Sequence, residues 1–289
     1  MFHLLIFVIF IGVLGVLIFD FLSRKKTEIN GAHVLVTGGS SGIGKAVAIK
    51  MARCGANVTI LARNMDRLEE TLKEVRKHLA PERKVLAFSV DLTVDAQDVE
   101  NTIDQACESL GPVDILINCA GFAVCGLFEE TTVDQFKFGI FGFSAYAASK
   151  FAVRGFAETL FMEVKPYNIG VSVVFPPDTD TPGFENENKG KPEETHLISS
   201  SGGLFTPDQV AAIMVAGIKN RKFLISCGFD GFAVKSLTCG IAPASSLFEL
   251  LVQVALMGPL RLVLAFYLYH YDRIVLNGMR KREASKKRN

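Results

Sequence analysis

The stretch that decides the fold is His33-Val34-Leu35-Val36-Thr37, followed at once by Gly38-Gly39-Ser40-Ser41-Gly42-Ile43-Gly44. Its first five residues suit a buried strand, and a helical pattern then runs to Arg53. Glycines at such a turn let the backbone approach a pyrophosphate, which the positive end of the helix stabilises. The order of strand, glycine turn and helix therefore predicts a dinucleotide-binding unit.

Further apolar strands are expected after this unit, with helical patterns between them. They are 57–61, 84–90 and 113–117, and then 170–175 and 223–226. Alternating strands and helices predict an α/β fold of the Rossmann type with a doubly wound parallel sheet. Asp91 and Asn118 stand at the ends of two strands, where residues of such sheets face the ligand crevice.

The residue after the second strand bears on which cofactor is bound. Enzymes that use NAD usually place an acid there to hold the ribose 2′-hydroxyl. This chain instead has Arg63, with Arg67 one helical turn further on. Arginine grips a 2′-phosphate through charge-assisted hydrogen bonds, so NADPH is favoured over NADH.

Tyr146 and Lys150 are four residues apart in a segment with helical propensity, 144–164, so they share one helix face. A neighbouring ammonium stabilises a phenolate and lowers the pKa of the tyrosine. The phenol could then exchange a proton with a carbonyl oxygen near neutral pH.

These motifs, in this order, resemble the short-chain dehydrogenase/reductase signature over about 32–226. The resemblance implies that cofactor phosphates and ribose are held by residues of the glycine turn, namely Gly38, Ser40, Ser41, Gly42 and Ile43. It places Arg63 and Arg67 at the 2′-phosphate and Asp91 at the adenine, and it carries Asn118 over as a further cofactor-binding residue. Tyr146 would be the general acid, and Lys150 would lower its pKa and hold the nicotinamide ribose. Cys119 departs from the pattern, because the family usually has asparagine there.

Two further runs, 162–168 and 175–184, resemble the membrane-bound members of this family that reduce 3-ketosphinganine in sphingolipid synthesis. In these members Thr179 and Thr181 would flank the nicotinamide carboxamide. The implied substrate is a long-chain ketolipid. A membrane-bound steroid or retinol reductase, and a non-catalytic NADP-binding chain, remain alternatives.

The segment before Tyr146 is short for this family. Asn118 and Tyr146 are 28 positions apart, whereas the resemblance calls for about twice that, because a central crossover helix and strand belong between them. The family serine that binds the substrate carbonyl and an asparagine of the proton relay have no match here. We therefore expect a sheet that lacks one central strand, and weak or absent activity.

Apolar segments flank this domain. The run 4–19 is followed by Arg24-Lys25-Lys26, which favours an uncleaved anchor with the domain in the cytosol over a signal peptide. A second run, 246–271, is split at Gly258-Pro259 and predicts a hairpin dipping into one leaflet, with two tilted spans or a core helix as alternatives. Lys286 and Lys287 resemble a dilysine retrieval signal of the endoplasmic reticulum.

The expected organisation is an anchor at 1–22, an NADP-binding reductase domain at 31–227, a membrane-associated region at 233–271 and a basic cytosolic tail at 272–289. A formal charge of +1 predicts no nucleic-acid partner, whereas membrane lipid is an expected one. The six cysteines form no CxxC pair and the five histidines have no metal-ligand spacing, so no metal site is expected. The sequence leaves open whether the chain forms a homo-oligomer.

Overall fold

The computed structural model describes residues 15, 26–121, 144–199, 203–240 and 242–286. The predicted anchor at 1–22 lies outside the described residues, apart from Gly15. The predicted retrieval signal is described only as far as Lys286.

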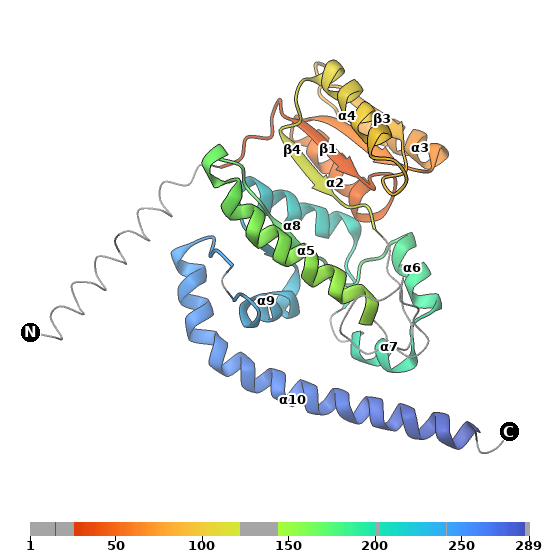
Figure 1. The fold of residues 1–289 in the computed structure, drawn as a ribbon, viewed down its shortest axis with the longest axis vertical. Coiled ribbons are helices and arrows are strands. Elements are labelled where there is room, and N and C mark those ends of the chain that lie inside the picture. The colour runs from red at the N-terminus through yellow and green to blue at the C-terminus, as the bar shows by residue number, and fades with distance from the viewer. Residues whose placement is uncertain (1–14, 16–25, 122–143, 200–202, 241, 287–289) are drawn as a thin grey trace, which may run out of the picture.

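The first half confirms the predicted alternation of strands and helices. Its elements are β1 (His33–Thr37), α2 (Gly42–Arg53), β2 (Asn57–Ala62), α3 (Met65–Arg76), β3 (Val85–Ser89), α4 (Ala96–Leu110) and β4 (Ile115–Asn118). The four strands form a parallel sheet in the order β3-β2-β1-β4 (Figure 1). All four carboxyl ends therefore reach the same edge of the sheet, which is where ligands bind in open α/β folds.

Helices cover both faces of this sheet because alternate side chains of its strands point to opposite sides. Val34 and Val36 of β1 belong to the large core cluster with α2 and α3. Leu35, between them, packs on the other face with Leu61 of β2 and Ile103 of α4. Burial on both faces explains why β1 is apolar throughout its centre instead of alternating with polar residues.

The second half begins with α5 (Ser144–Glu163), whose bounds match the predicted 144–164 within a residue. The remaining elements are a 3₁₀ turn η3 (Lys165–Tyr167), β5 (Val173–Phe175), α6 (Pro182–Lys189), α7 (Glu193–Ser199), α8 (Pro207–Lys219), β6 (Leu224–Ser226), α9 (Gly228–Leu237) and α10 (Leu247–Lys286). β5 and β6 pair with each other in parallel.

The sheet is divided in two. Among the described residues, β4 pairs only with β1, and β5 pairs only with β6, so no strand joins the two sheets. This is the position at which the sequence predicts that a strand is missing. Leu116 of β4 is 58% exposed, which is unusual for a strand inside a parallel sheet.

Helix α8 holds the two sheets together. Its buried face, which includes Val210 and Val215, belongs to the same core cluster as α2 and β1. At its other side Gly217 lies so close to Ile225 of β6 that any side chain would overlap it. A capping box starts this helix, with Thr206 and Gln209 each bonding the backbone of the other.

The C-terminal prediction of a hairpin is wrong. α10 is one helix of 40 residues that runs through Gly258 and Pro259, and Figure 1 shows it curving along its length. A proline removes one helical hydrogen bond and bends a long helix, but the intact turns on either side can carry the helix past it. The predicted separate tail at 272–289 is likewise helical as far as Lys286.

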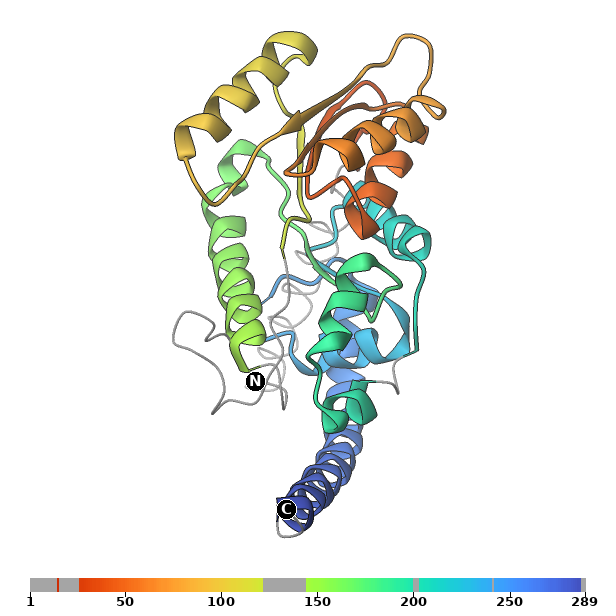
Figure 2. The same ribbon diagram turned by 90° about the vertical axis from the view of Figure 1, so that its right-hand side faces the viewer.

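α10 lies at the end of the molecule opposite the four-stranded sheet (Figure 2). Within the described residues, its stretch Leu247–Arg282 is the helix long and apolar enough to cross a membrane. Only 6% of its most apolar window is buried by the rest of the protein.

Candidate functional site

The glycine turn and the end of β4 meet at the carboxyl edge of the sheet. Gly38 has a φ of +67°, which disfavours any residue with a side chain. A Cβ at this position would lie 2.7 Å from both Cα and N of Ala120. The first two predicted motifs therefore pack directly against each other, and glycine is what permits the contact.

Thr37 stabilises this contact through hydrogen bonds, although the sequence analysis did not identify Thr37 as a functional residue. Its hydroxyl donates to Oδ1 of Asn118 at 3.4 Å and accepts from the backbone N–H of Ala120 at 3.3 Å. Its carbonyl accepts from N–H of Cys119 at 3.1 Å. The position of Thr37 could have revealed this role, because Thr37 is a hydroxyl residue at the end of a buried strand, directly before the glycine turn.

The start of α2 has the features of an anion site. Ser41 is its N-cap with an extended backbone, and its side chain makes no capping hydrogen bond to the helix. The first N–H groups of a helix have no partner inside the helix and attract phosphate. Ser40 is fixed by its carbonyl, which accepts from Thr71 Oγ1 at 3.2 Å. Ile43 is half-buried and packs against the core.

Arg63 and Asp91 meet at the ends of β2 and β3. A guanidinium nitrogen of Arg63 lies 3.7 Å from a carboxylate oxygen of Asp91, and the arginine side chain is 74% exposed. Hydrogen bonds from Thr93 hold the pKa of Asp91 below its usual value, and the charge of Arg63 adds to the effect. Arg67 is also exposed, in the first turn of α3, where its N–H donates to the capping Asn64.

A third predicted segment reaches the glycine turn from the other half of the chain. A Cβ at Gly42, whose φ is +53°, would lie 3.0 Å from Cγ2 of Thr181. Thr181 is the N-cap of α6 and accepts from N–H of Phe184 at 3.1 Å. Thr179, two residues earlier, is buried. The structure therefore places Thr181 beside the predicted phosphate site.

Tyr146 and Lys150 both belong to α5, one turn apart, as predicted. The side chain of Tyr146 lies outside the described residues. Burial lowers the pKa of Lys150, and the nearby Cys119 thiol opposes the shift. Burial raises the pKa of Cys119 to about 11, although Lys150 lowers it. The ammonium of Lys150 therefore lies near enough to the Cys119 thiol, at the end of β4, for each to affect the pKa of the other.

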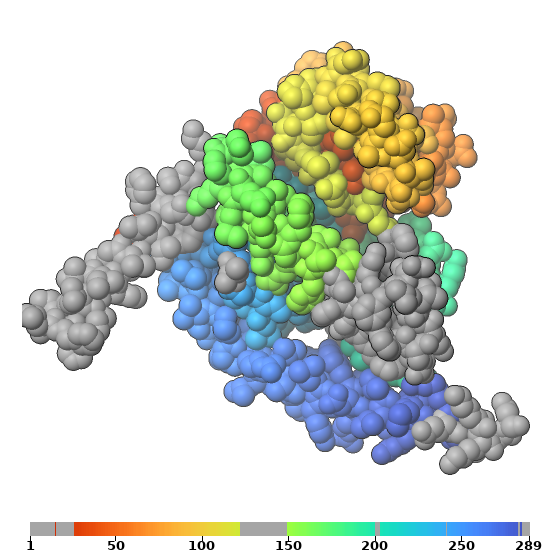
Figure 3. Space-filling view, viewed as in Figure 1, coloured from red at the N-terminus to blue at the C-terminus, as the bar shows by residue number. Residues whose placement is uncertain are grey.

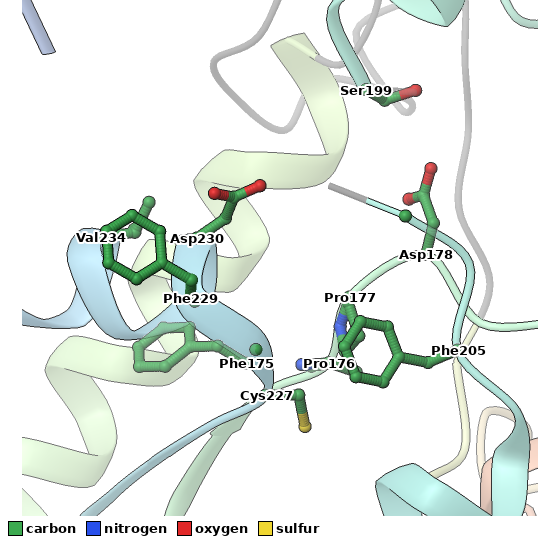
Figure 4. Close-up of a pocket in the computed structure, with 13 residues that line it drawn as sticks. Phe175, Pro176, Pro177, Asp178, Ser199, Phe205, Cys227, Phe229, Asp230 and Val234 are labelled. Atoms are coloured by element: carbon green, nitrogen blue, oxygen red, sulfur yellow. The ribbon is translucent and has the colours of Figure 1, made fainter. Parts of the chain in front are cut away.

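A cavity of about 460 Å³ opens at the carboxyl ends of β5 and β6. Its walls include Phe175, Phe205, Phe229 and Val234, and two carboxylates, Asp178 and Asp230, also border it (Figure 4). Its volume lies in the range of sites for small organic ligands. Residues 176–178 line it, and the same loop continues to Thr181 at the glycine turn, so the cavity adjoins the dinucleotide site.

These residues fit a dinucleotide. No side chain stands between Gly38 and Ala120, and the hydroxyl of Ser41 does not cap the start of the helix. Both features suit a pyrophosphate on the helix terminus. No cluster of three potential metal ligands occurs among the residues that were described.

Comparisons with known proteins agree with this geometry. The family model described as short chain dehydrogenase matches residues 32–138 and 135–192. A protein of Danio rerio named 3-dehydrosphinganine reductase is 43% identical, covering 97% of this chain and 96% of its own. A protein of Mus musculus named 3-ketodihydrosphingosine reductase is 45% identical over 88% of each chain. One of Arabidopsis thaliana, named 3-dehydrosphinganine reductase TSC10A, is 34% identical, covering 86% of this chain and 87% of its own.

Solved structures share the fold. A short chain dehydrogenase from Burkholderia cenocepacia, in complex with NADP, has a TM-score of 0.58 at 24% identity, covering 69% of this chain and 97% of its own. A dehydrogenase/reductase from Sinorhizobium meliloti has a TM-score of 0.57 at 25% identity, covering 69% of this chain and 96% of its own.

The same comparisons locate the missing segment. The family model matches in two pieces that meet at residues 135–138, between β4 and α5. The alignment with the Danio rerio protein spans 319 residues, more than the 289 of this chain. That relative therefore carries residues with no counterpart here, which agrees with the divided sheet.

Proposed function

Because the chain belongs to the short-chain dehydrogenase/reductase family, we propose that it acts as a 3-dehydrosphinganine reductase, reducing the ketone of 3-ketosphinganine to the alcohol of sphinganine. The observation that carries the proposal is the convergence of Gly38, Ala120 and Thr181 on one crevice at the carboxyl edge of the sheet. The likeness to reductases of that name over nearly the whole chain supports the substrate.

NADPH is the proposed cofactor, and when bound it supplies the hydride. Ser40, Ser41 and the N–H groups at the start of α2 would hold its phosphates. Arg63 and Arg67 would bind the 2′-phosphate, since both are exposed at the end of β2. Asp91 would meet the adenine, and it also fixes Arg63 through their ion pair.

Tyr146 is the proposed general acid, which donates the proton of its phenol to the ketone oxygen. Lys150 would lower the pKa of that phenol through its charge and would hold the nicotinamide ribose. Asn118, bonded to Thr37, would fix the end of β4 beside the cofactor. Thr181 would contact the nicotinamide carboxamide from the loop that also borders the cavity.

The cavity beside this crevice suits the chemistry of a sphingoid base better than that of a steroid or retinol. 3-Ketosphinganine carries an ammonium group next to its ketone and a long alkyl chain. The aromatic wall of the cavity can take alkyl carbons, and Asp230 is a carboxylate that forms no ion pair within the described part of the chain. We assign Asp230 to the ammonium group.

Turnover in this chain is proposed to be weak or absent, while NADPH binding is retained. The residues that would hold the phosphates and the adenine lie on the four-stranded sheet and at the starts of α2 and α3. The family's carbonyl-binding serine and its relay asparagine belong to the segment that this chain lacks. A non-catalytic NADP-binding chain is therefore the second candidate function, and the divided sheet is the observation that favours it.

The proposed location is the endoplasmic reticulum membrane, with the reductase domain in the cytosol. The N-terminal apolar run, its basic flank at Arg24 to Lys26 and the two lysines near the C-terminus support this location. The apolar exposed surface of α10 also supports a membrane-associated enzyme.

One experiment tests these assignments. The purified full chain, in detergent micelles, is titrated with NADPH by fluorescence and is then assayed with 3-ketosphinganine. In a matched variant, residues 122–143 are replaced by the corresponding longer segment of the Danio rerio protein. We expect both proteins to bind NADPH and only the variant to turn over at a substantial rate. Failure of both to bind NADPH would refute the reductase assignment, and normal turnover by the short chain would refute the proposed impairment.

A second arm tests the substrate in the variant with the longer segment. Asp230→Asn should raise KM for 3-ketosphinganine and leave KM for the same long-chain ketone without its amino group unchanged. Faster turnover of steroid or retinoid ketones than of 3-ketosphinganine would instead support the alternative reductases.

A further inference from the structure

α10 is attached to the reductase domain near its start. Nζ of Lys235, in α9, lies 2.6 Å from Oε1 of Glu249, and both side chains are nearly buried at 9% and 13% exposure. The other carboxylate oxygen of Glu249 accepts from N–H of Ser245. These bonds tie the first turn of α10 to α9 and hold the pKa of Glu249 below its usual value, against the raising effect of burial.

α10 is attached to the same domain again at its other end. Lys281 lies 3.0 Å from Glu193 of α7, and Arg282 forms an ion pair with Glu194, whose side chain is 3% exposed. Gly278 approaches Glu194 so closely that a Cβ there would overlap the carboxylate. The end of α10 therefore packs closely against α7, and the nearly buried carboxylate of Glu194 is paired there with Arg282.

Attachment at both ends is incompatible with a helix that crosses a membrane. Glu249 and Lys281 are 32 residues apart, or about 48 Å along a helix at 1.5 Å per residue. The hydrocarbon core of a bilayer is about 30 Å thick. A crossing helix would carry its two ends to opposite faces, yet both ends touch one reductase domain.

Between these attachments most of the helix surface is exposed, and the residues toward the domain are covered more than those on the opposite side. Residues on the side toward the domain, at helical spacing, are buried or half-buried: Gln253, Leu260, Leu264, Tyr271 and Gly278. Residues on the opposite side are apolar and exposed by 47–77%: Phe248, Leu251, Leu262, Phe266, Tyr269 and Leu276. We call the second set the outer stripe. In Figure 3 the outer edge of α10 forms a margin of the molecule.

The chemistry of the outer stripe fits a bilayer surface. An apolar stripe of this length is not expected to face water. Arg273 and Arg280 continue it toward the C-terminus and are exposed, which suits anionic headgroups. The guanidinium of Arg273 lies 6.0 Å from the ring of Tyr269, and tyrosine is enriched at membrane–water interfaces.

We infer that α10 lies in the plane of the membrane surface, with the outer stripe in lipid. The reductase domain is attached to both ends of α10. The inference goes beyond the proposed activity and does not depend on turnover. It places α7 and α9, which border the cavity through Ser199, Phe229 and Val234, next to the bilayer. An alkyl chain could then pass from lipid to the cavity without crossing much water.

The chain contains no tryptophan, so single introduced tryptophans report lipid contact directly. Three full-length variants, Phe248→Trp, Leu262→Trp and Leu276→Trp, sample the start, middle and end of the outer stripe. Each is reconstituted into vesicles of phosphatidylcholine and phosphatidylserine with bromines placed either near the headgroup or near the bilayer centre. Leu264→Trp, on the inner side of the same helix, is the matched control.

An in-plane helix places its apolar face about 5–10 Å below the headgroup boundary along its whole length. We therefore expect the same loss of fluorescence at all three outer positions, largest with the shallow bromines, and a smaller loss at Leu264→Trp. Quenching of Leu262→Trp mainly by the central bromines, with shallow quenching at both ends, would show a crossing helix and overturn the inference. Absence of quenching at all positions would overturn it too, because protein or a second copy would then cover the stripe.

A cysteine pair tests the attachment of α10 to α7 in sealed microsomes. Glu193→Cys with Lys281→Cys should be bridged by a short bis-maleimide reagent that replaces the length of the two native side chains, whose charged groups lie 3.0 Å apart. Glu193→Cys with Asn277→Cys is the control, because Asn277 precedes Lys281 by a turn and, among the described residues, forms no hydrogen bond or ion pair with α7. Failure of the first pair to cross-link more than the control would refute the attachment.

Discussion

Replacing Gly38 with alanine tests whether the glycine turn is the cofactor site. The φ of Gly38 is +67°, and a residue with a Cβ pays about 1–2 kcal/mol for such a conformation. The new Cβ would lie 2.7 Å from Cα and N of Ala120. These are backbone atoms that cannot rotate aside, so the end of β4 has to move away from the turn.

That movement would break the hydrogen bond from N–H of Ala120 to the hydroxyl of Thr37, which is 3.3 Å long and worth about 1 kcal/mol. Strain and lost bonding together remove about 2–3 kcal/mol from a total stability of the order of 5–15 kcal/mol. The variant should therefore still fold. Its NADPH affinity should fall by about tenfold or more, which corresponds to 1.4 kcal/mol or more, because the phosphates rest on the displaced turn.

Gly111→Ala is the matched control. Gly111 also has a positive φ, +82°, but a Cβ there meets no atom within 4 Å. It should lower the free energy of unfolding through strain alone and leave NADPH binding unchanged. Unfolding in urea is followed by circular dichroism, and NADPH binding by its fluorescence. If Gly38→Ala binds NADPH as tightly as the unchanged protein, the turn is not the phosphate site and the reasoning fails.

Three further outcomes are expected. Arg63→Ala should weaken NADPH binding about tenfold, since a hydrogen bond to a charged group is worth about 1.5 kcal/mol or more. The same substitution should leave NADH binding unchanged in the same titration. Equal losses of affinity for both nucleotides would contradict the 2′-phosphate assignment. Because the pKa of Cys119 is raised to about 11, its alkylation, followed by mass spectrometry, should keep accelerating as pH rises past 9, whereas a plateau near pH 9 would disprove the burial effect. Glu249→Gln should lower the free energy of unfolding by about 3–5 kcal/mol, because it leaves Lys235 buried without a partner. Glu74→Gln, from an ion pair of the same 2.6 Å length that is exposed to solvent, should leave it unchanged; equal effects of these two substitutions on urea unfolding would mean that burial does not matter here.

The local elements of this fold could be predicted from the sequence because their signals are local. The β-branched run at 33–37 and the glycine turn define β1 and the start of α2, and the capping pattern at Thr206 defines α8. The short interval before Tyr146 predicts a missing strand, and the two separate sheets of the described residues agree with that prediction. These features depend on neighbours within a few residues, or on the count of residues between motifs.

What the sequence could not reveal depends on distances between remote segments. The contacts of Gly38 with Ala120 and of Gly42 with Thr181 join residues far apart in the chain, and nothing in either segment specifies its partner. α10 was misread as a hairpin because Pro259 was taken as the end of a helix. The ion pairs that fix both ends of α10 join it to α7 and α9, and no local pattern records them.

The division of the sheet is the physical reason for proposing that NADPH binding survives where turnover is impaired. Every backbone contact that shapes the phosphate site joins β1 to β2 or β4, or to the turn beside them. Those strands keep their ladder bonds without the missing strand. By contrast, α5 packs with β5 and β6 in a separate core cluster, and α8 contributes its buried face to the cluster of the first sheet. An error of an ångström in the placement of Tyr146 is enough to cost a large part of the rate, whereas NADPH affinity does not depend on that placement to the same degree.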